Sequence, residues 1–359
     1  GDKNVAVGIF ALRYATTADN NTAVGWSALA ANTTGDRNAA LGAYALKANT
    51  TADANTAMGY EALKSNTTAE ANSAVGFQSL RANTTGANNT GIGMSALYSN
   101  TTGADNVAVG KDSLDSNTTG SGNVGIGSDA LQGNVSGSSN VAVGNDALKS
   151  NTLTGQTGIG NQSLEATTSG GENTAVGYKT LMTQSSNGHM NTAVGYQAGR
   201  LNTSGQSLTA IGFKALEANT TGDGNTAVGQ QALVATTTGP YNTAVGMSAG
   251  LRVTTGNSNT LLGQEAGQRV TTGAGNVAVG RGCLMFTTTG SSNIAIGYNT
   301  AQNTTGNDNV AIGHDALLNN TSGVKNVAVG RFASRTATGD SNVNIGYKSG
   351  HNQTTADGN

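Results

Sequence analysis

One short pattern of apolar and polar residues returns along the whole chain. An early copy contains Asn21, Val24 and Gly25, followed by a small residue, a leucine and an Asn-Thr-Thr-Gly sequence. The glycine that ends the apolar run recurs 21 times at intervals of 17 residues, with three intervals of 16 and one of 18. A repeat this regular indicates a solenoid in which each copy forms one coil.

Positions within a coil are counted here from this glycine as position 0. Position −1 is aliphatic in every coil, and position −2 is Ala or Gly except at Leu261 and Asn344. Position −4 is Asn except at Gln156 and Leu208, position +3 is small, and position +4 is usually Leu. The repeated structural ladder that we predict is represented by Asn21, Val24, Gly25, Asn55, Gly59, Asn72, Val75, Gly76, Val109 and Gly110.

Seventeen residues are too few for a strand and a crossover helix, whereas two strands of about five residues and two turns fit. The Thr-Ala-Val run is typical of a β-strand, and Asn-Thr-Thr-Gly is typical of a turn. We therefore predict an all-β fold, a parallel β-solenoid of about 21 coils. It forms one continuous array over residues 1–359, about 100 Å long at about 4.8 Å per coil. Neither end shows a polar capping coil, so we expect a slice of a longer fibrous protein.

The strand motif also bears on assembly. Successive strand residues point to opposite faces, so positions −2 and −1 cannot both face the interior of their coil, yet both are apolar. We expect one face to lie in the core and the other to pack against another chain, with Ala or Gly at −2 allowing a second backbone to approach closely. A symmetric bundle of identical chains is the expected partner.

The motif Asn-x-Ala-Val/Ile-Gly followed by x-x-Ala resembles the head repeat of trimeric autotransporter adhesins. The longer unit, which includes Asn-Thr-Thr-Gly, is similar to repeats in phage and bacterial tail-fibre proteins. The resemblance extends over essentially the whole chain. It implies a left-handed parallel β-roll wound as a homotrimer.

Composition excludes several classes of function. The net charge is −2 and only 11% of residues are charged, so no basic surface for nucleic acid is expected. No run of about 18 apolar residues predicts a membrane span. The single Cys283 stands where other coils have Ala or Ser, which indicates a small packing residue.

Residues suited to catalysis or metal binding are scattered. His189, His314 and His351 lie in separate coils, without the spacing of metal ligands, and are expected to be exposed loop residues. Three aspartates at position +2 of consecutive coils would stack about 5 Å apart, where mutual repulsion makes solvated surface positions the preferred interpretation. The three aspartates are Asp112, Asp129 and Asp146. We predict no enzyme, no cofactor and no metal site.

Two further rows face outward in this scheme. Paired threonines such as Thr33 and Thr34 would form either an ice-binding face or a turn ladder whose hydroxyls satisfy backbone groups, and we favour the turn ladder. Position +1 varies between aromatic, charged and polar residues, which indicates a surface that contacts glycans or the edge of a subunit interface. Its aromatic members are Trp26, Tyr60, Phe77, Tyr178, Tyr196, Phe213, Tyr298 and Tyr347.

The function expected from the sequence is therefore structural. We expect an extracellular, cell-surface or virion rod that acts in an adhesin, filament or tail fibre and presents attachment to a glycan or protein receptor. Self-association as a homotrimer is expected, and end-to-end filaments are a further prospect because uncapped coil edges can pair. The alternatives are an ice- or surface-binding solenoid that uses the threonines and, less favoured, a polysaccharide-acting enzyme.

Overall fold

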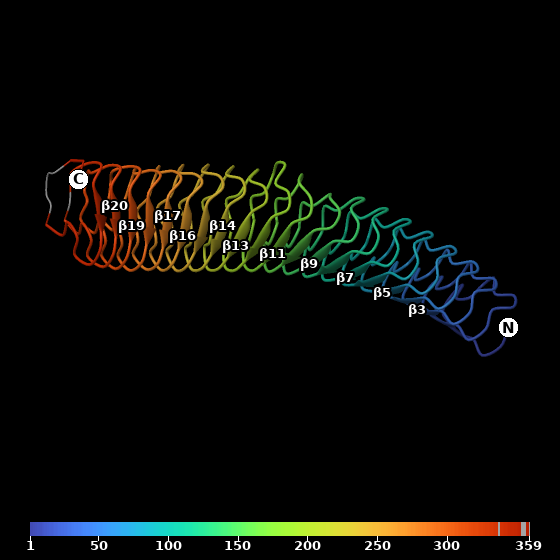
Figure 1. Cartoon of the computed structure of the whole chain (residues 1–359). Coiled ribbons are helices and arrows are strands. Elements are labelled where there is room, and N and C mark those ends of the chain that lie inside the picture. The colour runs from blue at the N-terminus through green and yellow to red at the C-terminus, as the bar shows by residue number, and fades with distance from the viewer. Residues whose placement is uncertain (337, 353–356, 359) are drawn as a thin grey trace. The chain divides into compact units, whose positions relative to one another are not determined.

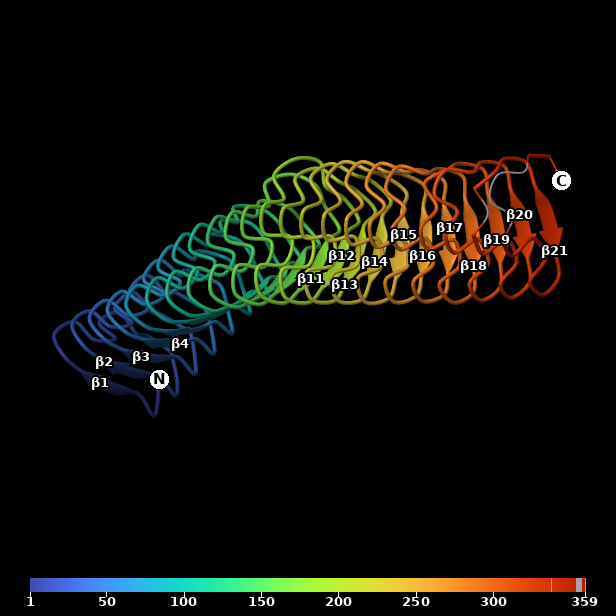
Figure 2. The same cartoon turned by 90° about the vertical axis from the view of Figure 1, so that its left-hand side faces the viewer.

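The computed structural model describes residues 1–336, 338–352, 357 and 358. The chain forms two compact units, Gly1–Val176 and Gly177–Asn359. In each unit the strands lie side by side, one per coil, as Figures 1 and 2 show. The described residues contain strands and turns and no helix. The prediction of an all-β parallel solenoid with a repeat of about 17 residues is thus confirmed for each unit.

The first unit contains eleven strands, and each pairs in parallel with the next along the chain. Equivalent positions of neighbouring coils face each other, so that Ala6 lies opposite Ala23 and Ala74 opposite Gly91. The strands are β1 (Val5–Val7), β2 (Thr22–Val24), β3 (Ala39–Leu41), β4 (Thr56–Met58), β5 (Ser73–Val75), β6 (Thr90–Ile92), β7 (Val107–Val109), β8 (Val124–Ile126), β9 (Val141–Val143), β10 (Thr157–Ile159) and β11 (Thr174–Val176).

The described residues of the second unit repeat this arrangement with ten strands. Parallel pairing in the same register extends from its first strand to its last, with Ala193 opposite Ala210 and Ala328 opposite Asn344. The strands are β12 (Thr192–Val194), β13 (Thr209–Ile211), β14 (Thr226–Val228), β15 (Thr243–Val245), β16 (Thr260–Leu262), β17 (Val277–Val279), β18 (Ile294–Ile296), β19 (Val310–Ile312), β20 (Val327–Val329) and β21 (Val343–Ile345).

Each coil contains one strand of three residues, so the prediction of two strands of about five residues is wrong. The segment after the glycine is a series of turns in which positions +2 and +4 have left-handed backbone, with φ of 55° at Ser27 and 49° at Leu29. Left-handed residues cannot continue a β-strand. Hydrogen bonds to adjacent coils nevertheless satisfy this segment, because the Ser27 and Leu29 amides donate to the carbonyls of Ile9 (2.9 Å) and Ala45 (3.0 Å).

The core of each coil is narrow and consists of the residues at positions −2, +3 and +4. Ala23, Ala28 and Leu29 fill it in one coil and are fully buried. Alanine at −2 therefore faces the interior of its own coil, and the expectation that it packs against a second chain is wrong. Because side chains alternate along the strand, the aliphatic residue at −1 is the one that points outward.

The exceptions at position −2 have a packing explanation. Leu261 extends into space left by glycine at position +4, since a Cβ added to Gly267 would lie 2.6 Å from Leu261 Cδ2, and one added to Gly250 would lie 2.9 Å from Cδ1. Asn344 occupies the corresponding space beside Gly350, where an added Cβ would lie 2.5 Å from its side chain. The larger side chain has thus moved from +4 to −2, and the core remains filled.

The glycine at position 0 is required by both backbone conformation and space. At Gly76, φ is +135°, which residues with a Cβ rarely adopt. A Cβ at Gly76 would also lie 2.4 Å from the carbonyl oxygen of Gly93, the equivalent glycine of the next coil. Neighbouring coils can therefore approach to hydrogen-bonding distance here only without a side chain.

We expect Gly76→Ala to lower the free energy of unfolding by at least about 3 kcal/mol, because it combines a strained backbone with a clash against backbone. Gly171→Ala is the matched control, since the nearest atom to its added Cβ is Gln156 Nε2 at 4.0 Å. Urea unfolding of both variants tests this. Equal stability of the two variants would contradict the steric account.

Candidate functional ladders and surfaces

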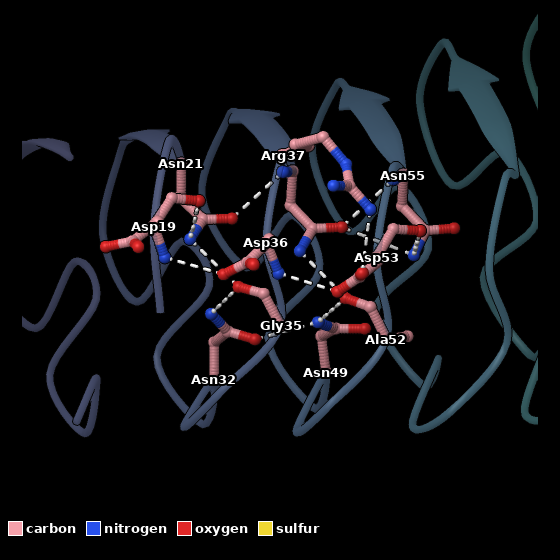
Figure 3. Close-up of polar contacts among 11 residues, drawn as sticks. Asp19, Asn21, Asn32, Gly35, Asp36, Arg37, Asn49, Ala52, Asp53 and Asn55 are labelled. Carbon is pink, nitrogen blue, oxygen red and sulfur yellow. Dashed lines mark hydrogen bonds and ion pairs between the residues drawn. The ribbon is translucent and has the colours of Figure 1, made fainter. Parts of the chain in front are cut away.

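Two columns of buried asparagines stabilise the interior of the coils (Figure 3). One column is at position −4 and the other at position +7. In one coil, Asn21 Nδ2 and Asn32 Nδ2 both donate to the carbonyl oxygen of Gly35, at 2.9 and 2.8 Å. We call this pair of hydrogen bonds the asparagine clamp. The clamp closes the coil, because it joins Asn21, which precedes the strand, and Asn32, in the turn segment, to the same carbonyl.

The same asparagines connect successive coils. Asn21 Oδ1 accepts a hydrogen bond from the backbone amide of Asn38 (2.9 Å), and Asn32 Oδ1 accepts one from Asn49 Nδ2 (3.0 Å). Of the predicted ladder residues, Asn55 forms the clamp bond to the Ala69 carbonyl at 3.0 Å. The column at +7 was interpreted from sequence only as part of a turn. Its signal was the recurrence of Asn at that position in coil after coil of the first unit.

The residues at position −1 form an apolar row of exposed and half-buried side chains on the outside of the strands, which we call the outer aliphatic row. Its members include Val75, Ile92 and Leu41, with 36%, 42% and 48% of their surface exposed. On soluble proteins, large contiguous apolar patches are typical of interaction surfaces. In the first unit the row comprises Val7, Val24, Leu41, Met58, Val75, Ile92, Val109, Ile126, Val143, Ile159 and Val176. In the second it comprises Val194, Ile211, Val228, Val245, Leu262, Val279, Ile296, Ile312, Val329 and Ile345.

The aromatic residues at position +1 are exposed, as expected, and stack on one another within each unit. Tyr60 and Phe77 have ring centroids 5.5 Å apart and nearly parallel planes. In the second unit Tyr196 stacks between Tyr178 (5.3 Å) and Phe213 (5.4 Å). Ring faces are therefore directed at the neighbouring coils and ring edges at solvent. Their role as contacts to a glycan or a subunit remains a prediction.

Two ring contacts were not anticipated from the sequence. Tyr44, at position +2, lies between Trp26 (4.6 Å) and Tyr60 (6.1 Å) and continues their row where position +1 is alanine. His314 stacks on Tyr298 at 5.2 Å and meets the edge of a further ring at position +2 of the next coil. His189, His314 and His351 lie in turns or loops and are half-buried, so the expectation of exposed loop residues holds only in part.

The threonines at +8 and +9 differ in environment. Thr33 Oγ1 donates to the Thr50 carbonyl at 3.0 Å, and Thr84 Oγ1 donates to the Thr101 carbonyl at 3.0 Å. This arrangement favours the turn-ladder interpretation for position +8. Position +9, represented by Thr34 and Thr85, forms a single exposed row. Adjacent threonines therefore do not make a flat two-row array.

The aspartates of position +2 are accompanied by lysines. Lys149 Nζ lies 2.9 Å from Asp146 and 3.8 Å from Asp129, and Lys111 Nζ lies 3.0 Å from Asp112. Burial, together with the charges of Asp112 and Asp129, raises the pKa of Asp115. Among the described residues, no three His, Cys, Asp or Glu side chains are grouped so that they could hold a metal ion, and no enclosed pocket is found.

A second aspartate row, at position −6, caps backbone amides (Figure 3). Asp36 Oδ1 accepts a hydrogen bond from the Asp19 amide, and Asp53 Oδ1 accepts one from the Asp36 amide, both at 2.7 Å. Arg37 adds an ion pair to Asp53 at 2.9 Å. These carboxylates therefore stabilise the turn between coils. Cys283 is likewise structural, because it is fully buried and its Sγ contacts the Gly297 carbonyl at 2.9 Å.

Glu61 is the most strongly perturbed acidic group. Burial favours its neutral form, but hydrogen bonds from Lys64 (2.6 Å), Arg81 (2.7 Å) and Gln78 (2.9 Å) outweigh burial. Together they lower the pKa of Glu61 from 4.5 to about 2. The ionised carboxylate thus joins two consecutive coils, because Gln78 and Arg81 belong to the coil after that of Glu61.

We expect stability to fall by up to about 3 kcal/mol as the pH drops from 4.5 to 2, because the folded protein holds Glu61 ionised in this range while the unfolded chain becomes protonated. Glu61→Gln should reduce this loss, and exposed Glu70→Gln should keep it. Urea unfolding at several pH values measures the difference. Identical pH profiles for Glu61→Gln and wild type would refute the role of Glu61.

Comparison with known proteins adds no family assignment to the fold. The chain matches no protein-family model, and no curated protein is significantly similar to it. Within the described residues, no helix is long and apolar enough to cross a membrane. The coils and their ladders define each unit as a β-solenoid of the repeat-protein class.

Proposed function

We propose that the chain is a structural segment of an extracellular fibre and that identical chains associate along the outer aliphatic row. The observation that supports this most is the outward-pointing aliphatic side chain of every coil, exposed in most coils and half-buried in the others, next to the exposed aromatic residues of position +1. Within the first unit this row extends over roughly 50 Å at about 4.8 Å per coil. Apolar surface that continues over such a length is costly in water and favours burial against a partner.

The expected partner is the same chain, and the expected number is three. The row repeats with the coil period, so two identical copies in the same axial register present matching apolar positions in every coil. Closed rotational symmetry then buries the row of each chain without leaving an open edge. The number three comes from the resemblance to adhesin heads and tail fibres. In such an assembly the chain acts mechanically, holding a receptor-binding part away from a cell or virion surface.

Sedimentation of the chain in dilute solution tests this proposal. We expect a mass near three times the 35.6 kDa of one chain. A triple variant, Ile92→Lys, Ile126→Lys and Ile159→Lys, places charge on the outer aliphatic row and should sediment as one chain. The matched control, Thr85→Lys, Thr102→Lys and Thr119→Lys, changes the exposed threonine row and should keep the larger mass. Wild-type protein at the mass of a single chain would refute association.

Attachment is a separate measurement. Beads coated with the assembled chain should bind cells or immobilised glycans if this segment itself contacts the receptor. They should bind neither if the receptor-binding part lies elsewhere in the fibre. The ice-binding alternative predicts thermal hysteresis, and the single outward threonine row gives it less support than a flat array would.

A further inference from the structure

The asparagine column at position +7 is interrupted in the second unit. Asn202 and Asn219 occupy this position in consecutive coils, and the five coils that follow have Thr or Val there, beginning with Thr236. All three side chains are fully buried. Asn219 Nδ2 makes both bonds of the usual pattern, to Asn202 Oδ1 at 2.9 Å and to the Gly222 carbonyl at 3.1 Å.

Two buried polar atoms remain at the interruption. Asn219 Oδ1 and Thr236 Oγ1 have no hydrogen-bond partner within the protein. Where one asparagine follows another in the column, Oδ1 accepts a hydrogen bond from Nδ2 of the next asparagine, as Asn83 Oδ1 does from Asn100 Nδ2 at 2.8 Å; Asn134 Oδ1 is an exception. A buried polar atom without a partner costs about 1–3 kcal/mol, so two in successive coils call for a bound group.

The chemistry of the two unpaired atoms fits one water molecule. Threonine has one side-chain heavy atom fewer than asparagine, and it lacks an equivalent of Nδ2. Equivalent positions of successive coils are about 4.8 Å apart, which is too far for a direct hydrogen bond but suits two hydrogen bonds of about 2.8 Å through one oxygen. Buried waters typically make about three hydrogen bonds.

We propose that a single water molecule is bound between these coils, in the place that asparagine Nδ2 occupies elsewhere in the column. It donates one hydrogen bond to Asn219 Oδ1 and one to the carbonyl oxygen of Gly239, the residue equivalent to Gly222. That carbonyl also accepts a hydrogen bond from Asn225 Nδ2 at 2.8 Å and a longer one from Asn242 Nδ2 at 3.4 Å. The water accepts its third hydrogen bond from Thr236 Oγ1. The water thereby completes the clamp in the coil of Thr236, the first coil after Asn219 that has no asparagine at position +7. This inference is independent of the proposed association of chains.

Three variants and one crystal structure test the proposal. Thr236→Asn should place Nδ2 at the water position, displace the water and keep the amide protons of this coil as protected from hydrogen exchange as in wild type. Thr236→Val keeps the shape but removes the hydroxyl that holds the water, so these amides should exchange about tenfold faster. Thr238→Val, at the exposed threonine of the same coil, is the matched control and should leave exchange unchanged.

The wild-type crystal structure should show one ordered water within hydrogen-bonding distance of Asn219 Oδ1 and Thr236 Oγ1. Two results would overturn the proposal. One is a wild-type structure in which Thr236 Oγ1 bonds Asn219 Oδ1 directly. The other is a Thr236→Val protein whose amides in this coil exchange as slowly as those of wild type.

Discussion

The hydrogen bonds of the asparagine at position −4, joined in most coils of the first unit by those of position +7 to form the asparagine clamp, are the interaction on which the coil depends. A coil of 17 residues is too narrow to hold water throughout its interior, so its inward backbone carbonyls need protein donors. Asn21 and Asn32 supply two donors to one carbonyl, and their own Oδ1 atoms accept hydrogen bonds from the next coil. Each clamp therefore fixes its own coil and the axial register of the neighbouring coil. A displaced coil would leave these buried groups unpaired, which is costly.

The narrow interior also determines which residues can face outward. Ala23, Ala28 and Leu29 fill the core of one coil. Where position −2 has the larger Leu261, position +4 has glycine, which shows that the side-chain volume available in the core is restricted. A larger aliphatic residue on every strand has no room inside and points to solvent. The surface proposed for association is thus a consequence of the way the coil packs.

Much of the fold was predictable because the repeat is strict. The period of the repeat indicated the length of one coil. Gly76 and the equivalent glycines indicated that the backbones of neighbouring coils approach closely. Which face of the strand lies against the core was not predictable. Ala and Val are both apolar, and the alternation alone does not say which of them points inward. The prediction of two strands per coil failed because Leu29, at position +4, adopts a left-handed backbone that leucine rarely adopts. The glycines at this position in other coils, Gly199, Gly250 and Gly267, did indicate a left-handed conformation there. The aromatic row was found from sequence, except that Tyr44 joins it from a neighbouring position.

Hydrogen exchange of asparagine side-chain amides tests the central role of the clamp most directly. In protein labelled uniformly with 15N, NMR distinguishes the side-chain NH2 groups of asparagine from backbone amides. The clamp predicts that most Nδ2 protons exchange as slowly as the backbone amides of the strands, because both are buried and released only when coils open. Exchange of the Nδ2 protons at the rate of free asparagine, with the strand amides still protected, would contradict it.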